Sequence, residues 1–350
     1  MADGKGVTVL FLGSGFTRGI GRIPTQKEGS FIDSVLGDGR EARISFYKIN
    51  GVPLPTWIRK IGDIEVCMSH LHNLAYSNLA TPSSKGMAKK AIINLRSAIR
   101  DYMIAQKVEK WDVACEFARR FIRDAGKDKV VILTTNYDLF TENVLKEGQG
   151  LEFEYPEIPL QRAHQEHAVP LYKLHGSINW MEERRVGDRE LIGVEPLYVR
   201  DDLADAKLDF VNVSNETHIS CKEKGGYWVY KENGTGRVYT PILIPFFYQK
   251  EEWLGQRWGY LFQRHWASAK NWFYDNEIEK MFFIGCGLPR ADTYLMSWLL
   301  SIFQKKKPET IKIVCDGDPD NLGKALSPFI NPDEDIYKCG LKHFLDHFKS

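Results

Sequence analysis

Several polar residues that could carry out chemistry follow directly on short apolar segments. Asn136 and Asp138 come just after KVVILTT, and His175 comes just after PLYKL. A histidine ordinarily titrates near neutrality and can act as a general base, while two polar side chains two residues apart can face one ligand. Each also has a structural interpretation: Asn136 and Asp138 can form an Asx turn that caps a helix over 139–145, and His175 can be a core or surface residue.

A glycine-rich turn is the second candidate. It follows the segment VTVLFL and consists of Gly13, Ser14, Gly15, Phe16 and Thr17. Two glycines between a strand and a helix let backbone N–H groups approach a pyrophosphate, and the threonine adds a hydroxyl donor. The full dinucleotide fingerprint has a third glycine where this chain has Arg18, so the turn can also be a tight connection only.

Two further turns follow apolar segments nearer the C-terminus. Gly285, Cys286 and Gly287 come after KMFFI, and Asp316 comes after TIKIVC. Chain reversal alone explains each turn. In a sheet that binds a dinucleotide, they would instead contact its ribose and adenine. The cysteine can be a reactive thiol or a residue packed beside the glycines.

The apolar segments themselves predict the scaffold. Near-continuous apolar runs are typical of strands that are buried on both faces of a parallel sheet. Between them, helical spacing extends over 87–104, 111–123, 253–275 and 292–304. Strands that alternate with helices indicate a doubly wound, Rossmann-like α/β fold with a mostly parallel sheet. Ligands of such sheets bind beyond the carboxyl ends of the strands, so we expect one crevice to collect the polar residues named above.

Two stretches depart from this alternation. Residues 20–86 contain several Gly and Pro and indicate an irregular, partly helical insert. Residues 181–240 are charged and Gly-rich, with a hairpin expected around 233–236. With 350 residues, the chain exceeds the roughly 250–300 at which one core stops growing, so the fold class includes a helical insert and a small β-hairpin insert.

Composition excludes several classes of protein. The balance of 47 Lys+Arg against 46 Asp+Glu gives no chain-wide field for nucleic acid or anionic lipid, so we predict no direct nucleic-acid binding. The six cysteines form no C-x-x-C pair and no histidine set has a convincing third ligand, so we predict no metal. No apolar run approaches the ~20 residues of a membrane helix, and we expect a cytoplasmic protein with no membrane association.

The motifs, taken in order, resemble those of the sirtuins, and most closely the branch found in bacterial antiphage defence. They are GSGFT, TTNYD, LHGSINW, PILIP, FIGCGLP and VCDGDP. The resemblance implies an NAD-binding domain over residues 1–350, a mainly helical insert over 20–130, and an insert over 181–245 in place of the family's zinc module. It also implies roles: the turn Gly13–Thr17 would hold the pyrophosphate, Asn136 the nicotinamide ribose and the attacking water, Asp138 would face the nicotinamide amide, and His175 would be catalytic.

Deacylase sirtuins carry two C-x-x-C pairs shortly after the His-Gly motif, whereas residues 180–224 hold one cysteine. We therefore expect an NAD+ hydrolase that releases nicotinamide and ADP-ribose, and that depletes NAD+ in antiphage defence. Such an activity needs restraint, which predicts a homo-oligomer or a partner protein such as a DNA-translocating ATPase. Two alternatives stay open: a protein deacylase or ADP-ribosyltransferase that uses 181–245 as its substrate module, and a non-catalytic regulatory subunit that binds NAD or ADP-ribose.

Overall fold

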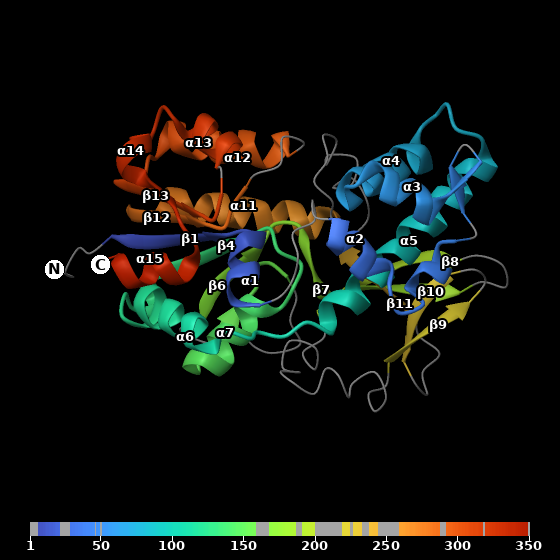
Figure 1. The fold of residues 1–350 in the computed structure, drawn as a ribbon, viewed down its shortest axis with the longest axis horizontal. Helices are drawn as coiled ribbons and strands as arrows, with labels where there is room; N and C mark the ends of the chain where they lie inside the picture. The colour runs from blue at the N-terminus through green and yellow to red at the C-terminus, as the bar shows by residue number, and fades with distance from the viewer. Residues whose placement is uncertain are drawn as a thin grey trace. The chain divides into compact units, whose positions relative to one another are not determined.

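The chain divides into two compact units. Figure 1 shows their helices and strands. Unit 1 comprises residues 1–22, 107–176 and 248–350, and unit 2 comprises residues 23–106 and 177–247. The structure is a computed structural model, and it describes residues 6–21, 29–45, 47–49, 51–158, 168–186, 191–199, 219–224, 227–232, 238–243, 259–287, 292–317 and 319–348.

Unit 1 is built on a seven-stranded sheet in which every strand pair is parallel. The five predicted strands are confirmed, and they are β1 (Val7–Leu12), β4 (Val130–Thr134), β6 (Val169–Lys173), β12 (Ile278–Ile284) and β13 (Thr310–Cys315). Two short edge strands, β5 (Phe153–Glu154) and β14 (Ile336–Lys338), were not predicted, because two or three residues show no periodicity. The strand order is β14-β13-β12-β1-β4-β6-β5.

Helices cover both faces of this sheet (Figure 1). One group contains α1 (Ser14–Ile20), α6 (Trp111–Ala118), α7 (Phe140–Gln149) and α15 (Leu341–His347), and α6 continues as a π-helix over Arg119–Arg123. The other group contains α11 (Gly259–Asp275), α12 (Thr293–Lys305) and α13 (Asp320–Leu326), while the short α14 (Pro332–Asp335) lies beside β13 and β14. The first six residues of the helix predicted over 253–275 lie outside the described residues.

The order of the strands reverses between β1 and β12. After β1 the chain continues to β4 on one side, and after β12 it continues to β13 on the other. The central strands are apolar and buried because both faces are covered; the side chains of Val9 to Leu12 and of Val130 to Leu133 are almost fully buried. The predicted doubly wound α/β fold is therefore confirmed, and its switch point, where such folds bind ligands, lies at the carboxyl ends of β1 and β12.

Unit 2 combines helices with an antiparallel sheet. Its helices are α2 (Gly29–Leu36), a 3-10 turn at Arg40–Arg43, α3 (Leu54–Ile61), α4 (Ile64–Tyr76) and α5 (Pro82–Ile104), and β2 (Lys48–Ile49) pairs with β3 (Val52–Pro53). Its larger sheet has the order β8-β7-β11-β10-β9, with β7 (Gly176–Val186), β8 (Leu191–Val199), β9 (Ile219–Lys224), β10 (Tyr227–Glu232) and β11 (Val238–Leu243).

The antiparallel sheet is larger than the predicted hairpin. The pairing of β10 with β11 confirms that hairpin, whose turn over 233–237 lies outside the described residues. The other strands were not predicted, because charged runs such as Glu182 to Arg185 hide the alternation of apolar and polar residues.

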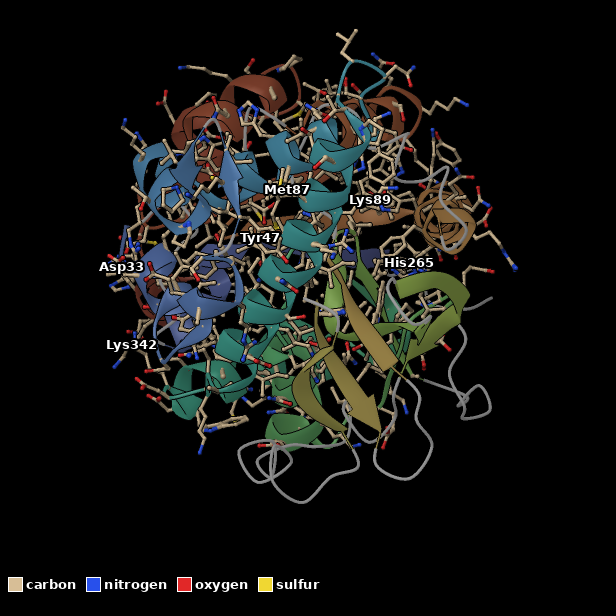
Figure 2. The ribbon with its side chains drawn as sticks, turned by 90° about the vertical axis from the view of Figure 1, so that its right-hand side faces the viewer. Asp33, Tyr47, Met87, Lys89, His265 and Lys342 are labelled. Carbon is tan, nitrogen blue, oxygen red and sulfur yellow. The ribbon has the colours of Figure 1, made fainter. Side chains whose placement is uncertain are left out.

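The two segments of unit 2 pack on each other through α5, which lies against β10 and β11. Arg100 Nε donates a buried hydrogen bond to the carbonyl oxygen of Ile178 at 2.9 Å, and Asn94 Nδ2 donates to the Tyr47 hydroxyl at 2.9 Å. Figure 2 labels Tyr47, together with Met87 and Lys89 of α5. Residues 107–130, which the sequence placed within the helical insert, belong to unit 1. Among the described residues, no helix combines the length and the apolar character needed to cross a bilayer.

Candidate active site

The turn after β1 packs directly on the turn after β12. The Gly13 N–H donates to Ile284 O and the Gly15 N–H donates to Gly285 O, both at 2.9 Å. A Cβ atom on Gly15 would lie 2.7 Å from Gly285 Cα. Gly285 has φ +63°, and a Cβ atom there would lie 2.1 Å from Phe16 N. The close backbone packing at the switch point therefore explains why glycine is needed at these positions.

Several donors of the glycine-rich turn are used within the protein. The Gly15 N–H is bonded to Gly285, and the Phe16 N–H donates to Gly13 O at 2.9 Å. The buried Thr17 hydroxyl donates to Asp138 Oδ2 at 3.0 Å. Ser14 is exposed, so its side chain is accessible to an incoming anion.

Asn136 connects the end of β4 with this turn. Its side-chain Nδ2 donates to Gly13 O and to Thr17 Oγ1, both at 2.9 Å. Thr134 Oγ1 accepts a hydrogen bond from the Asn136 N–H at 3.0 Å and donates to Leu12 O at 2.9 Å. The amide hydrogens of Asn136 are thus committed to the turn, and its Oδ1 is the atom that can accept a hydrogen bond from a substrate or water.

Asp138 forms the predicted helix cap and one hydrogen bond that was not predicted. Its Oδ1 accepts a hydrogen bond from the Phe140 N–H at 2.9 Å, as the Asx-turn interpretation requires, while Oδ2 accepts the one from the Thr17 hydroxyl. Burial raises the pKa of Asp138, and the positive charge of Lys173 opposes this rise. Lys173 Nζ donates to the backbone carbonyl of Asp138 and forms a fully buried ion pair with Glu142 Oε1 at 2.8 Å.

His175 lies in the turn between β6 and β7. Gly176, at φ +87°, has a backbone conformation there that favours glycine. His175 Nε2 lies 2.8 Å from Asp292 Oδ2, and both side chains are 0% exposed. The ring of Tyr137, between Asn136 and Asp138, lies 6.5 Å from the His175 ring, measured between centroids.

Neither Asp292 nor the cluster of Lys173 with Glu142 was predicted from the sequence. Asp292 directly precedes a helical repeat, which is a signal for an N-cap and carries no hint of a histidine partner. A lysine within an apolar strand was the one available signal for the ion pair, since a buried lysine requires a partner. The partners come from α7 and the start of α12, so only the fold brings them together.

Of the remaining predicted residues, Cys286 packs against the turn at Gly13. Cys286 is buried, its Sγ donates to Phe11 O at 3.1 Å, and burial raises the pKa of its thiol. Gly287 and Asp316 are exposed beyond the ends of β12 and β13. Direct hydrogen bonds or backbone packing join Gly13, Gly15, Phe16, Thr17, Asn136, Asp138 and Gly285.

Other kinds of site have less support. Across the described part of the chain, no three His, Cys, Asp or Glu side chains gather as a metal ion would need, and the absence of a metal stays a prediction. A surface pocket of about 370 Å³ opens beside α11, and none of the predicted site residues lines it; its walls are Glu157, Tyr172, Arg264, Ala267, Ser268, Asn271, Trp272 and Asp275.

A family model described as the SIR2-like domain matches residues 130–205, the segment that contains Asn136, Asp138 and His175. A solved structure of a Sir2 homologue in complex with NAD is similar to this chain, with 10% identity and a TM-score of 0.44 over 97% of this chain and 86% of that one. A mutant Sir2 homologue in complex with ADP-ribose has 10% identity and a TM-score of 0.40 over 97% and 88% of the two chains. A Sir2 protein bound to a myristoylated histone peptide has 13% identity and a TM-score of 0.40 over 97% and 87%. No curated protein matches the chain.

Proposed function

We propose that this chain is a sirtuin-like NAD+ hydrolase that cleaves the nicotinamide–ribose bond to give nicotinamide and ADP-ribose. The observation that supports it most is the hydrogen-bonded series Asn136–Thr17–Asp138 at the switch point, with His175 at the end of the next strand but one from β1. The SIR2-like match includes Asn136, Asp138 and His175, whereas Thr17 lies outside it.

In this proposal the end of β1 holds the pyrophosphate. The exposed Ser14, at the start of α1, would supply donors from its N–H and hydroxyl groups, at the end of the helix that attracts anions. Gly13, Gly15 and Gly285 have no side chains, so the phosphates could approach the backbone closely. Thr17 would act indirectly, by fixing the side chains of Asn136 and Asp138.

The reaction needs an oriented water and a proton acceptor. Asn136 Oδ1 would accept a hydrogen bond from the water or a ribose hydroxyl, and His175 would accept the proton. The water oxygen bonds to the anomeric carbon, the electron pair of the C–N bond leaves with neutral nicotinamide, and the proton passes through His175 to solvent. Asp138 would face the nicotinamide amide.

The experiment is to incubate the purified chain with NAD+, with and without an acylated peptide, and to quantify nicotinamide by chromatography. We expect acceptor-independent release that falls by about 10²-fold or more in Asn136→Ala and His175→Ala. The exposed His343 provides a matched control, and His343→Ala should keep the wild-type rate. Strict dependence on the peptide would favour a deacylase or transferase, and intact bound NAD+ would favour a regulatory subunit.

We further propose that the activity serves antiphage defence by depleting NAD+, and that self-association or a partner protein such as a DNA-translocating ATPase restrains it. The support is chemical: unrestrained hydrolysis of NAD+ would harm the cell that makes the enzyme. Light scattering combined with the nicotinamide assay tests the proposal, and a monomer that is fully active alone would contradict it.

A further inference from the structure

A buried carboxylate lies against the proposed general base. His175 Nε2 and Asp292 Oδ2 are 2.8 Å apart, and both side chains are completely buried. Burying a carboxylate is costly unless a positive group compensates it, so the contact indicates an ion pair that the fold maintains.

Asp292 is held in place from its other side. It is the N-cap residue of α12, and its Oδ1 accepts a hydrogen bond from the Leu295 N–H at 3.1 Å. The Leu295 side chain is fully buried, which fixes the first turn of the helix. One carboxylate oxygen therefore orients the group, and the second oxygen is directed to His175.

The same indole supports both partners. Trp266 Nε1, on α11, donates to Leu174 O at 3.0 Å, one residue before His175. The Trp266 ring also contacts Tyr294, two residues after Asp292, edge-on with centroids 5.1 Å apart. The backbones that carry the histidine and the aspartate are thus both positioned against α11.

We infer that Asp292 is a positioning residue for His175, an inference that rests on the proposed function. A carboxylate 2.8 Å from Nε2 favours a proton on that nitrogen, so the neutral ring would carry its lone pair on Nδ1. Nδ1 is then the atom that takes the proton from water or a ribose hydroxyl. The carboxylate also stabilises the imidazolium that forms until the proton is released to solvent.

Asp292→Asn separates this role from simple capping. Asparagine caps helices as well as aspartate does, so Oδ1 can keep its bond to the Leu295 N–H. Its NH2 group would then face His175 Nε2 and donate to it, which places the ring proton on Nδ1 and removes the base. Asp63 provides the matched control, because it caps α4 with bonds from the N–H groups of Glu65 and Val66 at 2.9 and 3.1 Å.

The test compares wild type, Asp292→Asn and Asp63→Asn by kcat, KM, melting temperature and the NMR shifts of the histidine ring nitrogens, with His175→Gln used for assignment. We expect Asp292→Asn to lower kcat by about 10²-fold with KM and melting temperature nearly unchanged, and to change the His175 tautomer. Asp63→Asn should leave kcat and the tautomer as in wild type.

A kcat of Asp292→Asn within twofold of wild type, or an unchanged tautomer, would overturn the inference. A fall in kcat matched by Asp63→Asn would do so as well, because it would reflect capping alone. If wild-type protein leaves NAD+ intact, the proposed function fails, and the ring-nitrogen shifts alone decide whether Asp292 sets the tautomer of His175.

Discussion

Removing the buried ammonium of Lys173 should destabilise unit 1 strongly. Lys173 and Glu142 are both 0% exposed and form an ion pair at 2.8 Å beneath Asp138. Glu142 Oε1 also accepts the hydroxyl hydrogen of Tyr155 at 2.7 Å. In Lys173→Met the carboxylate stays buried and keeps the tyrosine as its donor, while its positive partner is lost.

The expected loss of stability in Lys173→Met follows from the cost of a buried charge that has lost its partner. Breaking such a pair from one side costs about 3–5 kcal/mol, whereas replacing both partners is often close to neutral. Lys173→Met should therefore cost about 3–5 kcal/mol, and adding Glu142→Gln should recover most of that loss. The glutamine can still accept the hydrogen bond from the Tyr155 hydroxyl.

Urea unfolding followed by circular dichroism measures these differences in a cycle of wild type, two single variants and the double variant. A coupling energy of at least about 2 kcal/mol would support the reasoning. A cost below about 1 kcal/mol for Lys173→Met, or a double variant as unstable as the sum of the single ones, would refute it.

Three further predictions concern other parts of unit 1. Gly285→Ala should cost roughly 2 kcal/mol or more in urea unfolding, because φ is +63° and the new Cβ meets Phe16 N at 2.1 Å; Gly62→Ala, at φ +75° with no atom within 4 Å, should cost about 1 kcal/mol. A similar cost for both would contradict the packing explanation. Burial lowers the pKa of His265 (Figure 2) from 6.5 to about 4, so between these pH values the unfolded state binds more protons than the folded state. The free energy of unfolding should therefore fall by up to about 3 kcal/mol as the pH falls from 6.5 to 4. His265→Gln should flatten this pH dependence, and an unchanged slope would argue against the explanation. Cys286 should react with a thiol reagent only after denaturation, because it is buried and burial raises the pKa of its thiol; mass-spectrometric detection of rapid native labelling would contradict this.

The sequence carried enough information to predict the main sheet. Strands such as Val130–Thr134 are buried on both faces and therefore read as continuous apolar runs with abrupt polar ends. The short strand at Phe153–Glu154 gave no such signal, because pairing with a neighbour, and not its own two side chains, makes it a strand. The antiparallel sheet of unit 2 was underestimated for a similar reason, since its charged residues obscure the period of two.

The candidate site was predicted in part. Residues that end neighbouring strands must meet at one sheet edge, so Asn136, Asp138 and the turn at Gly13 could be grouped from the sequence. That Thr17 donates to Asp138 could not be predicted, because it depends on side-chain rotamers across 121 residues of sequence. Asp292 was missed because its partner is set by how the start of α12 packs.

The release of nicotinamide from NAD+ tests the central claim most directly. Proton NMR of a mixture of purified protein and NAD+, with no acceptor added, follows substrate and both products together. We predict nicotinamide and ADP-ribose in equal amounts, with the reaction nearly abolished in Asn136→Ala. Intact NAD+ after hours in every oligomeric state of the protein, or an Asn136→Ala variant as fast as wild type, would contradict it.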